Sequence, residues 1–115
     1  MKNVNELVQQ SSQEIRRGLL VLSVLASLEN SQYGYSLIQV LEAKGISIEG
    51  NTLYPLLRRL EEQSLLESEW NTETGSKPRK YYKTTNKGKE VFKDLKNIWY
   101  ETVKNMNKIL GGYDE

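Results

Sequence analysis

The stretch that decides the fold runs from residue 51 to residue 66 and reads NTLYPLLRRLEEQSLL. When its residues are placed at intervals of about 100°, the leucines gather on one side of an α-helix. These leucines are Leu53, Leu56, Leu57 and Leu60. The other half of the helix carries Asn51, Tyr54, Pro55, Arg58 and Arg59. The pattern therefore predicts a helix that is anchored to a core by its leucines and leaves a polar face free for a partner.

The ends of this helix are marked by local signals. Asn51 or Thr52 is the expected N-cap, because a short polar side chain can accept a hydrogen bond from the first turn. Pro55 then falls in or just after the first turn, where its missing N–H costs little. Ser64 is expected to end the helix.

Two further helices are predicted before the leucine-faced helix of residues 51–66. In the first, over residues 13–28, the apolar positions recur at spacings of three and four. They include Ile15, Leu19, Leu22, Leu25 and Leu28. Neighbouring apolar residues widen this face, so the helix is expected to be buried on more than one side, by the core or also by a partner subunit. The second helix is expected over about residues 33–44, with Asn30 or Ser31 as its cap and Gly45 as its stop.

A hairpin and a long helix are predicted after the leucine-faced helix. Residues 66–84 contain two strand-like runs separated by a loop rich in turn formers, which predicts a hairpin with a long, mobile tip. Thr85 can cap a final helix over about residues 86–110. One side of that helix carries a heptad seam of Phe92, Leu95, Trp99, Thr102, Met106 and Ile109. A helix that extends so far past a small core needs a second surface to bury this seam, most simply another copy of the chain.

Composition excludes several classes of function. The 115 residues are enough for one domain, and they include no cysteine and no histidine. Thiol chemistry, zinc–thiolate sites and the commonest general base are therefore excluded, and we expect no enzyme, no metal and no cofactor. No run approaches the ~18 apolar residues of a membrane span, so a soluble cytoplasmic protein without a membrane partner is expected.

The order of the elements predicts a mainly α fold with a small β-hairpin, arranged as a winged helix-turn-helix with a long C-terminal dimerisation helix. In that plan the third helix enters the major groove of double-stranded DNA and the hairpin lies on the flanking backbone. The expected DNA contacts are Asn51, Thr52, Tyr54, Pro55, Arg58 and Arg59 in the helix and Lys77, Arg79 and Lys80 in the hairpin. The six cations from Lys77 to Lys89 are not interrupted by any acid, which favours phosphate neutralisation.

We divide the chain into a DNA-binding domain over residues 1–84, with about ten disordered N-terminal residues, and a dimerisation helix over 85–115 that is no independent domain.

Three segments, YGYSLIQVLE, GNTLYPLLRRLEEQSLL and RKYYKTTNKG, resemble the PadR family of bacterial transcriptional regulators. The resemblance covers about residues 15–110 and is closest to the smaller members, which are homodimeric repressors. It implies that Tyr54 and Arg58 face DNA, that residues 66–84 form the wing, and that the C-terminal helix packs on the partner subunit. The interface residues expected on this basis are Leu19, Leu95, Trp99, Thr102, Met106 and Ile109.

Two positions depart from the family pattern. Ser64 stands where a glycine is usual, so a left-handed turn there would be strained. Thr84 stands where a leucine is usual, which is expected to weaken one core contact under the wing. Trp70, at the end of the first wing strand, is expected to be a packing residue.

The resemblance also implies a second role, because some small family members bind flat hydrophobic compounds at the dimer interface between tryptophans. Trp99 is placed to contribute, with Ile15 and Phe92 nearby, although the first helix offers no aromatic partner. The simpler interpretation is that Trp99 only buries apolar area in the interface.

The leading hypothesis is a homodimeric repressor that binds a palindromic operator and is released by a hydrophobic or aromatic effector. The alternative is a winged-helix protein–protein adaptor that does not bind DNA.

Overall fold

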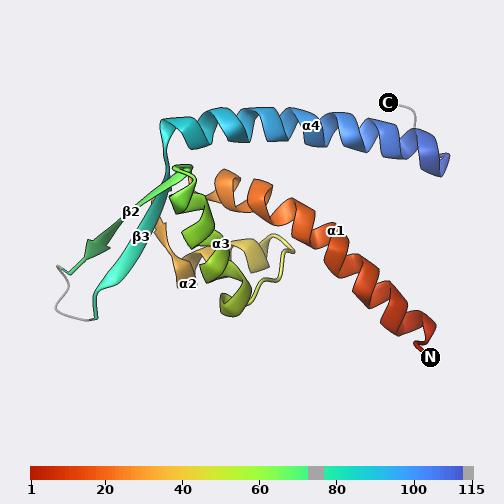
Figure 1. The fold of residues 1–115 in the computed structure, drawn as a ribbon, viewed down its shortest axis with the longest axis horizontal. Coiled ribbons are helices and arrows are strands. Elements are labelled where there is room, and N and C mark those ends of the chain that lie inside the picture. The colour runs from red at the N-terminus through yellow and green to blue at the C-terminus, as the bar shows by residue number, and fades with distance from the viewer. Residues whose placement is uncertain (73–76, 113–115) are drawn as a thin grey trace.

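Two long helices extend from a small body that carries a hairpin (Figure 1). In this computed structural model, residues 1–72 and 77–112 are described. The elements are α1 (Val4–Ser27), β1 (Gln32–Tyr33), α2 (Gly34–Ala43), α3 (Gly50–Glu62), β2 (Leu66–Asn71), β3 (Arg79–Thr84) and α4 (Asn86–Leu110). This order confirms the predicted fold class, a winged helix-turn-helix followed by a long C-terminal helix. No helix in the described ranges is long and apolar enough to cross a membrane.

The first helix starts earlier than the sequence predicts. The N-terminal residues expected to be disordered form its first turns, because Asn3 and Glu6 make a capping box. The side chain of Asn3 accepts a hydrogen bond from the Glu6 N–H at 2.9 Å, and the Glu6 carboxylate accepts one from the Asn3 N–H at 3.3 Å. The helix therefore begins at Val4 instead of residue 13.

The second helix lacks the predicted side-chain cap. Its N-cap is Tyr33, and neither Asn30 nor Ser31 fills that position. The reason is a strand that the sequence analysis missed: Gln32 and Tyr33 are extended and pair with β3 before the helix begins. Gly45 stops the helix as predicted, with a φ of 92° that suits glycine.

The wing is an antiparallel hairpin in a sheet with strand order β1-β3-β2. Its register pairs Leu66 with Thr84 at the base and Asn71 with Arg79 toward the tip. The hairpin is as predicted, while the expected mobility of its tip concerns residues 73–76, which lie outside the described residues.

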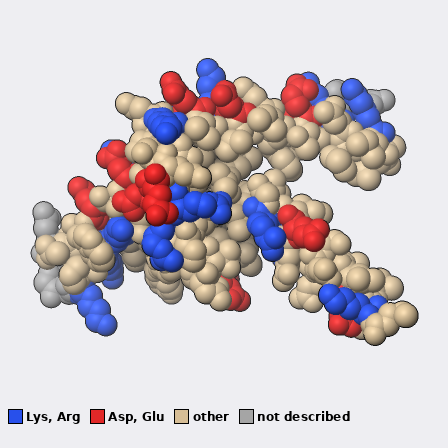
Figure 2. All heavy atoms as spheres, in the orientation of Figure 1, with Lys and Arg blue, Asp and Glu red and all other residues tan. Residues whose placement is uncertain are grey.

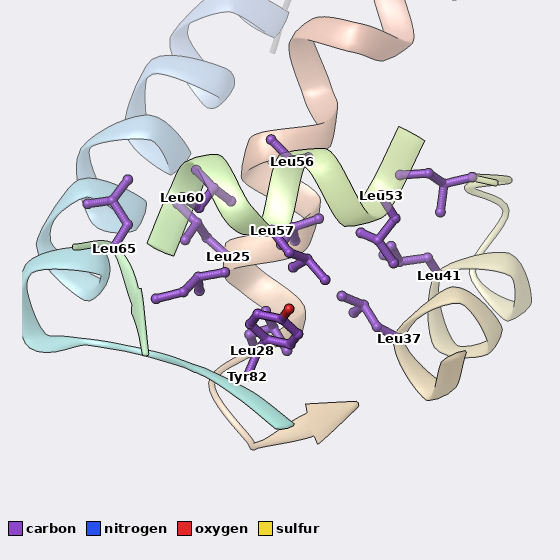
Figure 3. Close-up of a cluster of buried hydrophobic side chains, with 13 residues drawn as sticks. Leu25, Leu28, Leu37, Leu41, Leu53, Leu56, Leu57, Leu60, Leu65 and Tyr82 are labelled. Atoms are coloured by element: carbon purple, nitrogen blue, oxygen red, sulfur yellow. The ribbon is translucent and has the colours of Figure 1, made fainter. Parts of the chain in front are cut away.

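The predicted leucine face of α3 forms the centre of the core (Figure 3). Leu53 and Leu57 are completely buried, and Leu56 and Leu60 are nearly so. They pack against leucines of α1 and α2 and against Tyr82 of the wing. Full burial of one such side chain stabilises a fold by about 1.5–3 kcal/mol, so the orientation of α3 is firmly set. The helix begins at Gly50, with Glu49 as its N-cap, so the predicted caps Asn51 and Thr52 lie in its first turn.

The base of the wing joins α1 and α4. Thr84 is buried, and both its N–H and its hydroxyl donate to the Leu28 carbonyl, at 3.0 Å and 2.9 Å. The expected weak contact at this position is thus replaced by a hydrogen bond that satisfies a carbonyl at the end of α1. Thr85 caps α4 as predicted, accepting from the Gly88 N–H at 3.0 Å.

Candidate nucleic-acid interface

All six predicted contact residues of α3 are exposed. At about 100° per residue, Asn51, Pro55 and Arg58 point directly away from the buried leucines. The remaining residues lie on the two flanks of this face. Tyr54 faces the wing, whereas Thr52 and Arg59 line a hollow beside α1. The helix therefore presents a central polar ridge with a different neighbour on each side.

Tyr54 is held in place by two glycines. A Cβ atom on Gly34 would lie 2.4 Å from Cε1 of Tyr54, and one on Gly50 would lie 3.2 Å from Cε2. The ring therefore packs directly on the first turns of α2 and α3, while 40% of the residue remains exposed. Such a seat gives the ring a fixed position from which it can meet a ligand.

An aromatic hollow of about 320 Å³ separates α3 from the wing. Its lining, which defines the name, consists of Tyr33, Gly34, Tyr54, Trp70, Arg79, Lys80 and Tyr82. Trp70 is 64% exposed, so the prediction that it is a packing residue is wrong. It stands opposite Lys80 near the end of β2, toward the tip of the hairpin. The missed signal was its place at the outer end of the strand, where the core no longer reaches.

The three predicted wing cations have different surroundings. Lys77 is exposed. The Arg79 guanidinium lies 4.6 Å from the centroid of the Tyr33 ring, a cation–π contact. Lys80 Nζ lies 3.5 Å from Glu61 Oε1, and the other oxygen of that carboxylate accepts a hydrogen bond from Ser68. Glu61 was not singled out in the sequence, yet it joins α3 to both strands of the wing.

The arginines of α1 and α3 form a second group of cations. Within residues 1–72 and 77–112, the observed ion pairs involve only Lys80 and Lys104. Arg16, Arg17, Arg58 and Arg59 are exposed and unpaired in that part of the chain. Figure 2 shows cationic side chains over the wing, α3 and the middle of α1, interspersed with acidic side chains on the same face. Because these arginines have no acidic partner in the described residues, they can interact with a polyanion.

An apolar cleft of about 700 Å³ separates α1 from α4. Its lining, which defines the name, consists of Ile15, Gly18, Leu19, Val21, Leu22, Leu95, Ile98, Trp99, Thr102 and Met106. Of the predicted interface and ligand residues, Phe92 packs against the core instead, and Ile109 lies beyond the cleft. The exposed fraction is 37% for Trp99 and 41% for Met106, so the cleft is open in the single chain.

The buried leucine face, the exposed face of α3 and the hairpin define a winged helix-turn-helix protein. The model of the transcriptional regulator PadR-like family matches residues 21–94, and the chain belongs to this family. It is therefore a DNA-binding transcription regulator.

Solved structures agree with this assignment. A PadR family transcriptional regulator from Eggerthella lenta is 45% identical, with a TM-score of 0.86 over 92% of this chain and 94% of that one. A PadR family transcription regulator from Clostridium difficile is 30% identical, with a TM-score of 0.74 over 80% and 98%. A PadR-like transcriptional regulator from Bacillus cereus is 28% identical, with a TM-score of 0.77 over 87% and 99%. The similarity thus extends beyond the matched residues into both long helices.

Proposed function

We propose that the protein is a homodimeric repressor that binds a palindromic operator in the cytoplasm and is released by a hydrophobic small molecule. The exposed ridge of α3 carries this proposal. Its side chains project from a helix that four buried leucines hold rigidly, so base and phosphate contacts need no rearrangement of the fold. Asn51 and Arg58 have side chains that read adenine and guanine edges in the major groove.

The dimer in this proposal forms through α1 and α4. The two helices leave an apolar cleft that is open in a single chain, and burial of such a surface is the main driving force for association. In a twofold dimer the two recognition helices must lie about 34 Å apart to enter successive major grooves. The angle between the long helices sets this distance, so the same surface would control assembly and operator spacing.

An effector would act on this spacing. Trp99 and Ile15 supply an apolar and aromatic lining, which suits a flat hydrophobic compound. Bound there, the compound would favour dimers whose recognition helices are wrongly spaced for the operator. Operator binding would then weaken without any change in the DNA-facing residues.

The DNA part of the proposal is tested by selection from a random duplex library, followed by binding at several salt concentrations. We expect a palindromic site and a steep salt dependence, with a slope of log K against log salt of about −0.9 per phosphate contact. Arg58→Ala should weaken binding about tenfold or more, because one base or phosphate contact is lost in each subunit. Its circular dichroism should not change, since Arg58 is exposed and unpaired in the described residues.

Lys93→Ala provides the matched control, because Lys93 is an exposed cation on α4 outside the apolar cleft. Equal losses in both variants would show that only total charge matters. No selected site together with a flat salt response would favour the protein–protein adaptor.

The effector part is tested by fluorescence. Trp70→Phe leaves Trp99 as the single tryptophan of the chain. Titration of this variant with planar hydrophobic cations should quench and shift the Trp99 emission, and the same compounds should release operator DNA. Compounds that change the emission without releasing DNA would remove the effector from the proposal.

A further inference from the structure

A second hollow, of about 410 Å³, lies between α1 and α3 on the side of α3 away from the wing. Arg17 of α1 and Arg59 and Thr52 of α3 line it above an apolar floor that includes Leu20 and Leu56. No carboxylate takes part in this lining. We call it the arginine hollow. Two cations therefore face one small space without an acid to neutralise them.

The fold fixes the backbone positions from which these two cations project. Arg17 lies one turn before Leu20 on the stripe of α1 that faces α3, and Arg59 lies between the buried Leu57 and Leu60. Both guanidinium groups are unpaired in the described part of the chain. Like charges that share a hollow repel each other, and an anion between them removes this cost. The arrangement thus favours an anionic occupant.

We propose that the arginine hollow seats a backbone phosphate of the operator, an inference that rests on the DNA-binding function proposed above. Guanidinium groups match phosphate oxygens with paired N–H donors, and the Thr52 hydroxyl can add a third donor. The DNA footprint then includes α1, which the sequence did not single out for this role.

The position of the arginine hollow also indicates which part of the operator supplies the bound phosphate. The wing is joined to one flank of α3 through Glu61 and Lys80, and the arginine hollow occupies the other flank. The apolar cleft of α1 and α4, the proposed dimer surface, also lies beyond this flank of α3, on the face of α1 opposite the arginine hollow. The bound phosphate therefore belongs to the segment between the two half-sites, and the wing contacts the outer flanks.

The proposed phosphate site does not extend from the arginine hollow farther along α1. The adjoining hollow shares Arg17, Leu20 and Thr52 with the arginine hollow and is also lined by Arg16 and Glu49. The Glu49 carboxylate would repel a second phosphate there. One phosphate per subunit, two per dimer, is thus the expected number.

The test uses the full-length protein and duplexes that carry the selected palindrome. Arg17→Gln should weaken binding about fivefold to tenfold and make the salt slope shallower by about 1.8, which is 0.9 for each of two contacts. Arg17→Lys should restore most of the slope, because it keeps the charge. Lys93→Gln is the matched control, and its slope should equal that of the unchanged protein.

A second set of duplexes locates the contact. Neutral methylphosphonates between the half-sites should weaken binding by the unchanged protein more than binding by Arg17→Gln, which retains only Arg59 and Thr52 at the phosphate. Neutral linkages on the outer flanks should weaken both proteins equally. An unchanged affinity and slope for Arg17→Gln, or equal sensitivity of both proteins to central neutralisation, would overturn the inference. Failure of the unchanged protein to bind any duplex would instead refute the proposed function.

Discussion

Ser64 has a φ of 64°, the one positive φ among the described residues other than glycine. It follows the C-cap of α3, and the Leu65 N–H behind it returns to the Leu60 carbonyl at 2.9 Å. A left-handed backbone places Cβ close to the next carbonyl and costs roughly 1–2 kcal/mol in an L-residue. The strain predicted from the missing glycine is therefore present in the structure. The turn persists because Thr85 donates its hydroxyl hydrogen to the Ser64 carbonyl at 2.6 Å.

Ser64→Gly should raise the free energy of unfolding by about 0.5–1 kcal/mol, since part of the relief is offset by the greater freedom of glycine in the unfolded chain. Urea denaturation at one fixed protein concentration measures this as a higher midpoint at unchanged slope. Ser64→Ala keeps the Cβ atom and should bring no gain. A gain as large from alanine would show that the hydroxyl, and not the backbone, carries the strain.

For the residues of the candidate nucleic-acid interface, the sequence could predict exposure but could not predict contacts between distant segments. The exposure of Asn51 and Arg58 followed from the helical period, because the leucines fix the orientation of α3. Contacts between segments distant in sequence could not be foreseen, since no local pattern encodes them. Examples are the pairing of Glu61 with Lys80 and the hollow shared by Arg17 and Arg59.

At the scale of elements, the junction between the end of α3 and the start of α4 is closely packed. A Cβ atom on Gly88 would lie 2.1 Å from the Leu65 carbonyl oxygen. That oxygen also accepts a hydrogen bond from the Thr85 N–H at 3.1 Å. Backbone occupies the space beside Gly88, so no side-chain rotation can make room there.

Gly88→Ala should therefore lower the free energy of unfolding by about 1–3 kcal/mol, the usual cost of overpacking, even though alanine favours helix over glycine. Thermal or urea unfolding measures the loss. Gly18→Ala is the matched control, with both substitutions measured in the monomeric Met106→Asp background, because Gly18 lines the proposed dimer surface but has open space around its Cβ position in the single chain. Equal effects of the two substitutions would mean that α4 can shift without cost.

Element boundaries were predicted best where a strong period and a cap coincide. The final helix, with Thr85 as its cap, was predicted with the bounds that the structure shows. The start of α1 was missed because its first turns are polar, although Asn3 followed three residues later by Glu6 is a capping-box signal. The two-residue strand β1 was missed because so short a segment has no period, and only its pairing with β3 defines it.

At the scale of the whole molecule, two long helices diverge from the body and leave large apolar side chains uncovered (Figure 1). α4 has 25 residues, which corresponds to a length of about 37 Å. The molecule measures 55 Å along its longest axis and 24 Å along its shortest. A chain of this size cannot cover both helices with its own core, which agrees with the proposed dimer.

Met106→Asp should convert the dimer to a monomer, because it places a carboxylate in the apolar cleft that a second chain would cover. Sedimentation velocity over a range of concentrations measures the change. The fold of each chain should survive, since Met106 is already 41% exposed. Asn97→Asp adds the same charge on the exposed opposite side of α4 and should leave the dimer intact. If the Met106 variant still sediments as a dimer, the interface lies elsewhere.

The two stripes of α1 have a mechanical consequence. One stripe lines the apolar cleft and the other lines the arginine hollow, and both belong to one continuous helix. A helix turns as a unit, so a rotation imposed on one side displaces the other in the opposite sense. An effector bound in the apolar cleft would thus displace the DNA-facing Arg17 by rotating α1 as one rigid helix, without an intervening loop.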